Sequence, residues 1–268
     1  MDDRTMDGAL ARGATAEQAP GKHRGALGAL LAVIVAVLAK GKLALFFLLG
    51  KIKFLLLGLT KLGSLSSMAL SMWFYALTWG WKFAAGLVIS IYIHEMGHVA
   101  ALRHFGIRAT APMFIPGFGA FIRLQQPLTN PVHDARSGLA GPVWGLAAAV
   151  SAYVVYRVTN QPIWAAIAGS GAWINLFNLI PVWSLDGSRG FRSMSRGERW
   201  LAAFFVGAAF VATRETLLAV IAVVAAVRSF RTNPEEVSDR TGTALYCWLI
   251  ATLSLLAYVA HAGAPRGH

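Results

Sequence analysis

The feature that most constrains this chain is a group of ionisable residues inside a long apolar run. Residues 83–93 contain no charged side chain, and a His-Glu-Met-Gly-His sequence follows at 94–98. As a helix, the stretch 83–104 is long enough to cross most of a bilayer. His94 and His98 would project from one helix face about a turn apart. Ionisable groups inside a membrane span are costly unless they are paired or bound to a ligand, so this motif predicts a functional site.

Two imidazoles at this spacing can hold one zinc ion, and the neighbouring Glu95 can reach a water molecule at the metal. A hydrolytic zinc site usually has three protein ligands, so a third is expected where another acidic or imidazole side chain interrupts apolar sequence. Asp186 is the best candidate, because it follows an apolar span that ends at Pro181 on the same predicted side as His98. Asp134 is the next candidate.

Two asparagines also interrupt the span that precedes Asp186. Asn175 and Asn178 lie on one face of the predicted helix and need hydrogen-bond partners if they are buried. Two further histidines, His104 and His133, stand in polar flanks, so we expect both to be exposed.

Composition supports a membrane protein. Of the 268 residues, 56% are hydrophobic and 13% charged, and apolar stretches continue almost to the C-terminus, which leaves no room for a sizeable soluble domain. The net charge is +12, but the basic residues lie between apolar runs and do not form a patch interleaved with exposed aromatic residues. We therefore interpret them as determinants of membrane orientation and expect no nucleic-acid partner. A single cysteine excludes an internal disulfide.

The chain divides into five predicted segments. They are a polar, disordered tail (1–25), an apolar segment interrupted by lysines (26–62), a core that carries the His-Glu-Met-Gly-His motif (63–192), C-terminal transmembrane helices (193–262) and a polar tail (263–268). The second segment fits either a pair of interfacial helices or one strained span. From residue 63 onward, seven spans are predicted: 64–81, 83–104, 138–156, 162–181, 200–213, 216–227 and 243–260. Arg214-Glu215 suggests a tight turn between the fifth and sixth, although one interrupted helix also fits.

Basic residues cluster in alternate connections between these spans. This asymmetry predicts a multi-pass protein of the cell membrane, with the metal site near the cytoplasmic face. The apolar stretch 106–131 is broken by proline and glycine, so it is predicted to form a re-entrant loop or a short hairpin.

Three motifs together resemble the site-2 protease family of intramembrane zinc metalloproteases. The first is the His-Glu-Met-Gly-His sequence at 94–98, and the second is Ala140-Gly141-Pro142. The third begins at Asn178 and continues through Pro181 to Leu185-Asp186-Gly187. The resemblance covers roughly residues 83–192. Trp183 and Gly145 depart from it, since family members often have proline and asparagine at these two positions.

The resemblance implies an all-α membrane protein, a polytopic transmembrane helical bundle with a three-helix metalloprotease core. It further implies one Zn²⁺ per chain held by His94, His98 and Asp186, with Glu95 as the catalytic base. The substrate would be a membrane-anchored protein, cut in or near a transmembrane segment. Asn178 is expected to bind the substrate backbone or the developing oxyanion.

Two other functions remain open from the sequence. A metal-ion transporter could use the same ligands, but it would need further acidic or histidine residues on a path to the opposite face, and the apolar run before His94 contains none. A catalytically inactive binding protein is the other alternative. The intact Glu95 argues against it, because metal binding alone does not require this carboxylate.

Overall fold

The computed structural model describes residues 63–117, 119–126, 128–231 and 237–263, which all belong to one compact unit, 57–268. The predicted tail 1–25 and the lysine-interrupted segment 26–62 lie outside the described residues, as does nearly all of the predicted tail 263–268.

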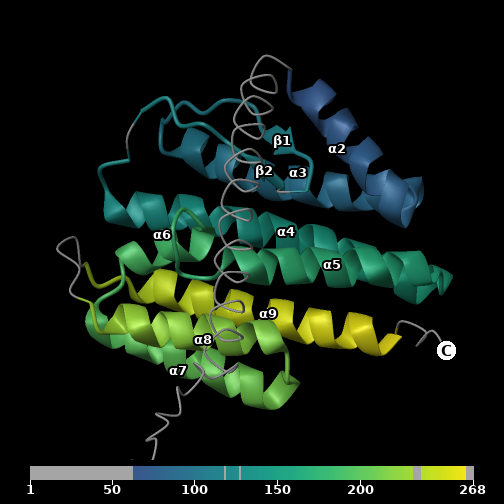
Figure 1. Ribbon diagram of the computed structural model, residues 1–268. Coiled ribbons are helices and arrows are strands. Elements are labelled where there is room, and N and C mark those ends of the chain that lie inside the picture. Colours follow the sequence, from purple (N-terminus) through teal and green to yellow (C-terminus); the bar gives the residue numbers. More distant parts are fainter. Residues whose placement is uncertain (1–62, 118, 127, 232–236, 264–268) are drawn as a thin grey trace, which may run out of the picture. The chain divides into compact units, whose positions relative to one another are not determined.

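The described chain is mostly helical (Figure 1). A helix occupies each of the seven predicted spans, and one short helix and a two-stranded hairpin lie between them. In chain order the elements are α2 (Ser64–Trp79), α3 (Trp81–His104), β1 (Met113–Ile115), β2 (Gly119–Phe121), α4 (Pro131–Thr159), α5 (Pro162–Asn178), α6 (Asp186–Arg192), α7 (Arg196–Thr213), α8 (Thr216–Ser229) and α9 (Arg240–Gly263).

Helix α4 lies at the centre of this unit. It packs against α3 on one side and α5 on the other, and also contacts α6 and α9 (Figure 1). Helix α2 packs on α3, whereas α7 and α8 pack on each other and α9 joins them to α5. Small residues allow the close approach of α3 and α4: a Cβ at Gly97 would lie 2.5 Å from the carbonyl oxygen of Ala140.

Three described helices are long and apolar enough to cross a membrane: Trp81–His104, Pro131–Thr159 and Arg240–His261. Helix α8 is apolar but shorter. This agrees with a membrane protein, as the composition predicts.

Helix boundaries follow from local chemistry. Helix α4 begins seven residues before the predicted span at 138, because the Asn130 side chain accepts hydrogen bonds from the first amides and Pro131 suits the first helical position. The helix ends at Asn160, whose left-handed backbone (φ 55°) reverses the chain ahead of Pro162. Arg214 is also left-handed (φ 59°), so α7 and α8 form a helical hairpin and not one interrupted helix.

The stretch 106–131 contains a short antiparallel hairpin, one of its two predicted forms. Phe114 in β1 pairs with Ala120 in β2. Helix α2 holds the outer edge of β1: the amide of Phe114 donates to Ser67 Oγ at 3.2 Å, and the amide of Gly117 donates to Tyr75 OH at 3.2 Å. The backbone at that edge is therefore already hydrogen-bonded within the protein.

Candidate metal centre

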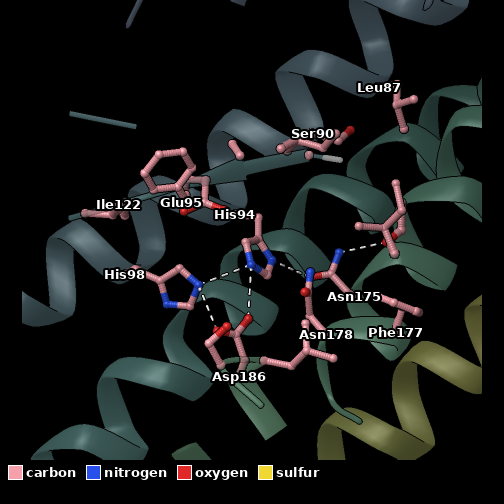
Figure 2. Close-up of a pocket in the computed structure, with 18 of the residues that line it drawn as sticks. Leu87, Ser90, His94, Glu95, His98, Ile122, Asn175, Phe177, Asn178 and Asp186 are labelled. Atoms are coloured by element: carbon pink, nitrogen blue, oxygen red, sulfur yellow. Dashed lines mark hydrogen bonds and ion pairs between the residues drawn. The ribbon is translucent and has the colours of Figure 1, made fainter. Parts of the chain in front are cut away.

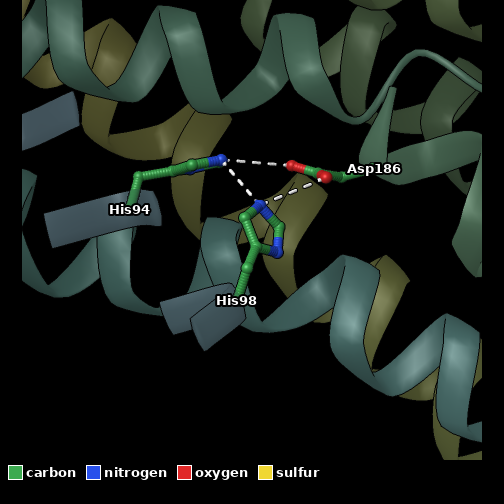
Figure 3. Close-up of side chains that lie close together, drawn as sticks. All are labelled: His94, His98 and Asp186. Atoms are coloured by element: carbon green, nitrogen blue, oxygen red, sulfur yellow. Dashed lines mark hydrogen bonds and ion pairs between the residues drawn. The ribbon is translucent and has the colours of Figure 1, made fainter. Parts of the chain in front are cut away.

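Three potential ligands from two distant parts of the chain meet at one point (Figure 3). Nε2 of His94 lies 3.2 Å from Nε2 of His98. The carboxylate of Asp186 lies 3.2 Å from Nε2 of His94 and 3.3 Å from Nε2 of His98. All three side chains are buried. The helix periodicity of α3 brings the histidines together, and the start of α6 supplies the carboxylate.

The other nitrogen of each imidazole has a partner that fixes its tautomer, and Figure 2 shows the one at His94. Nδ1 of His98 lies 2.7 Å from the carbonyl oxygen of Ser137, which can only accept, so this nitrogen carries the hydrogen. Nδ1 of His94 lies 2.8 Å from Oδ1 of Asn175, whose amide nitrogen donates to the Gly171 carbonyl at 2.7 Å. Both Nε2 atoms consequently present lone pairs to each other and to the carboxylate.

This arrangement fits a metal cation. Two lone pairs and a carboxylate converge in a buried space, and Oδ2 of Asp186 has no hydrogen bond there. Two imidazole nitrogens and one carboxylate oxygen leave a fourth position of a tetrahedral ion open.

Glycines of α4 make room for the cluster. A Cβ at Gly141 would lie 2.2 Å from Nε2 of His98, and one at Gly145 would lie 2.1 Å from Oδ1 of Asn175. Either contact is far shorter than van der Waals contact, so α4 can approach the ligands this closely only with glycine at both positions.

A cavity of about 990 Å³ opens beside the cluster. Glu95, which is buried next to His94 on α3, lines it, and Asn178 lines it from the last position of α5 (Figure 2). The hairpin contributes Ala120 and Ile122 to the wall. The remaining described wall is largely apolar, with side chains from α2, α3 and α5: Tyr75, Trp79, Leu87, Ile91, Trp173, Ile174 and Phe177.

Other ionisable residues from the sequence lie elsewhere. Asp134 is buried, but its carboxylate accepts from Arg189 at 2.8 Å and from Arg192 at 3.0 Å, so it joins an ion-pair network and not the His94 cluster. His104 is exposed, as expected. The expectation for His133 is wrong: it is half-buried, because its ring stacks on Phe105 with 4.2 Å between centroids.

Two supporting groups had no place in the predicted site. For Asn175 the sequence predicts only that a buried side chain needs a hydrogen-bond partner, and in the structure this partner is His94. The Ser137 carbonyl carries no sequence signal, since every residue has a carbonyl. Its hydrogen bond with His98 results from the packing of α3 on α4.

Comparison with known proteins confirms the resemblance to the site-2 protease family. The sequence model of Peptidase family M50 matches residues 82–162, which include His94, Glu95 and His98 and end before Asp186. A zinc metalloprotease of Methanocaldococcus jannaschii is 23% identical over 113 residues, which are 40% of this chain and 32% of that relative. The match thus spans about a third of the relative's length. Together these similarities support a metallopeptidase of the membrane.

Proposed function

We propose that this protein is an intramembrane zinc metalloprotease that hydrolyses peptide bonds in or near transmembrane segments of membrane-anchored proteins. The observation that carries the proposal is the convergence of His94, His98 and Asp186 beside Glu95, at a cavity within an apolar helical unit. The family similarity and the relative's description as a zinc metalloprotease support it. The proposed fold is a polytopic bundle with a core of α3, α4 and α5.

The metal in this proposal is one Zn²⁺ per chain, and His94, His98 and Asp186 would hold it. When bound, it would act as a Lewis acid toward the scissile carbonyl and lower the pKa of a water ligand towards ~7. Glu95 takes a proton from the attacking water and later delivers it to the leaving amide nitrogen, so the C–N bond is cleaved and both new termini are complete. Asn178 lines the cavity and would donate a hydrogen bond to the substrate backbone or the oxyanion.

The hairpin offers a way to hold an extended substrate. The amide of Phe114 points away from β2, towards Ser67, so the Phe114–Ala120 pair is one of the pairs that exchange no hydrogen bonds. By alternation, the backbone polar groups of Ala120 and Ile122 point away from β1, and both residues line the cavity. An unwound peptide could add to this edge of β2 as a strand.

The proposed orientation places the metal centre near the cytoplasmic face of the cell membrane. Arg136, Arg189 and Arg228 gather at the end of the unit where α3 ends and α4 and α9 begin. A cysteine at the exposed Gly197, on a Cys247→Ala background, should react with an impermeant reagent only after permeabilisation. Reaction in intact cells would place this end outside.

Replacement of Glu95 by glutamine tests the function itself. Glu95→Gln keeps the size and hydrogen bonding of the side chain but removes the base, so the variant should retain about one zinc per chain and lose about 10²–10⁴-fold or more in cleavage of a membrane-anchored reporter. His94→Ala should lose the metal, and Glu215→Gln at the α7–α8 turn is the matched control that should keep both. Cleavage by Glu95→Gln at the parental rate would refute the mechanism. Transport of zinc into liposomes by a parental protein that cleaves nothing would favour the transporter.

A further inference from the structure

The chain segment that carries Asp186 has local backbone hydrogen bonds: the amide of Leu185 donates to the Val182 carbonyl at 3.1 Å, and the amide of Ser188 donates to the Leu185 carbonyl at 2.9 Å. The segment leaves α5 at Asn178 and enters a helix of only seven residues at Asp186. Leu185 precedes that helix without a side-chain cap, and Trp183 adopts a left-handed backbone (φ 48°) with 91% of its surface exposed. Local bonds shape the turn itself, whereas its placement relative to α3, and with it the direction of the Asp186 carboxylate, depends on contacts from other helices.

Arg228, in the last turn of α8, joins the two sides of the turn. Its Nη1 donates to the carbonyl oxygen of Pro181 at 2.9 Å and to Oγ of Ser188 at 2.8 Å. One acceptor lies five residues before Asp186 and the other two residues after it. Because both bonds come from one guanidinium nitrogen, they fix the start and the end of the turn relative to each other.

Tyr246, on α9, holds the beginning of the same turn. Its hydroxyl donates to the carbonyl oxygen of Leu179 at 2.8 Å, and its ring is fully buried against the edge of Phe191 in α6, with centroids 5.2 Å apart. The Leu179 carbonyl also lies close to Gly187, the residue after Asp186. A Cβ at Gly187 would lie only 2.0 Å from this oxygen, so the approach requires glycine. Tyr246 thus fixes the surface on which α6 begins.

We infer that Arg228 and Tyr246 are positioning residues of the metal centre, through which α8 and α9 hold the Asp186 carboxylate towards His94 and His98. The inference rests on the proposed metal site. It assigns a role at that site to two helices that lie outside the matched residues 82–162 and outside the predicted core 63–192. The ligands alone would then not form a competent site without the C-terminal helices.

Metal affinity of the full-length protein in detergent tests this role directly. Arg228→Met removes both hydrogen bonds, and Tyr246→Phe removes one hydroxyl but keeps the ring. Loss of a group that orients a ligand lowers metal affinity about 10–100-fold, so we expect an effect of this size for Arg228→Met and a smaller one for Tyr246→Phe. The matched controls, Arg214→Met and Tyr258→Phe, change the same chemical groups at exposed positions of the same helical region and should bind zinc like the parent.

Two further measurements separate positioning from general stability. Leu253→Ala removes a fully buried side chain of α9 and should lower Tm without weakening zinc binding to the folded protein. The visible spectrum of bound Co²⁺ should change in Arg228→Met and Tyr246→Phe but not in Leu253→Ala, because it reports ligand geometry. If both variants match the parent in zinc affinity and Co²⁺ spectrum, or if Leu253→Ala weakens zinc equally, the inference is overturned. A parental protein that binds no zinc would instead refute the proposed metal centre.

Discussion

Gly141→Ala isolates the packing of α4 against the ligand cluster. An alanine Cβ at this position would lie 2.2 Å from Nε2 of His98 and 2.8 Å from Nε2 of His94. Carbon and nitrogen atoms in ordinary contact stand about 3.5 Å apart, so the His98 ring would have to withdraw by about 1 Å. Its Nδ1 hydrogen bond to Ser137 opposes this movement, and ligand distances in metal sites vary by only about 0.2 Å. We expect zinc affinity to fall by at least about 100-fold, which corresponds to about 2.7 kcal/mol.

Metal content and competitive zinc titration of the purified variant measure this loss. Gly207→Ala in α7 is one control, because no atom lies within 4 Å of the new Cβ, and it should stabilise the helix by about 0.5–1 kcal/mol. Gly171→Ala in α5 is the other, because its Cβ would meet Ala149 at an ordinary 3.4 Å. A folded Gly141→Ala protein with parental zinc affinity would show that the imidazoles do not bind a metal at this place.

Of three further predictions, two concern groups around the site and the third concerns the start of α7. Asn175→Ala leaves the buried Nδ1–H of His94 without its acceptor, so zinc affinity should fall about 10–100-fold in the same titration, whereas Asn175→Asp keeps an acceptor and should retain the metal. Tyr75→Phe loosens the hairpin and should raise KM for a membrane-anchored reporter without changing kcat or zinc content. Burial would raise the pKa of Glu198, but hydrogen bonds from Ser195, Ser238 and Asp239 hold it below its ordinary value. A carboxyl group whose pKa is lowered by folding stabilises the protein at pH values above its unfolded pKa, and this stabilisation is lost as the pH falls through the folded pKa. At pH values below about 4, Tm of the parent should therefore decrease more steeply with falling pH than Tm of Glu198→Gln.

The sequence predicted those parts of the site that depend on local geometry. The spacing of His94 and His98 determines their common helix face wherever α3 packs, and an acid after an apolar span is conspicuous in a chain with few charges. The structure accordingly brings Asp186 within 3.3 Å of both histidines. The N-terminus of α4 was also readable from Asn130-Pro131, although the apolar pattern alone put the span seven residues later.

Long-range partners could not be read in this way. Asn175 and His94 are 81 residues apart, and their contact depends on how α5 crosses α3. The same holds for Arg228 and the turn at Pro181, 47 residues away. Arginine near a predicted helix end is ordinary in a membrane protein, so its position alone predicts orientation and says nothing of the carbonyl to which it donates.

The lengths of α3 and α5 bear on how the proposed hydrolytic site, inside an apolar unit, would receive water. His98 and His94 precede the end of α3 by six and ten residues, or about 9 and 15 Å along the helix. Helix α5 has 17 residues and is about 26 Å long, which is shorter than the ~30 Å hydrocarbon core. It ends at Asn178, which lines the same cavity as His94 and His98. Irregular backbone at such a depth is tolerated only against protein or a wet cavity.

The cavity has both kinds of wall that the proposed reaction requires. Asn178, Ser184 and Arg189 line it on the side of the turn, towards the basic end of the unit, whereas Leu87 and Trp173 line it along the apolar parts of α3 and α5. In the proposed reaction, water would approach Glu95 along the polar side, and a transmembrane peptide would lie along the apolar side. The two reactants then meet only at the cluster of His94, His98 and Asp186, so cleavage is expected within the substrate's membrane segment, about two helical turns below the end of α3.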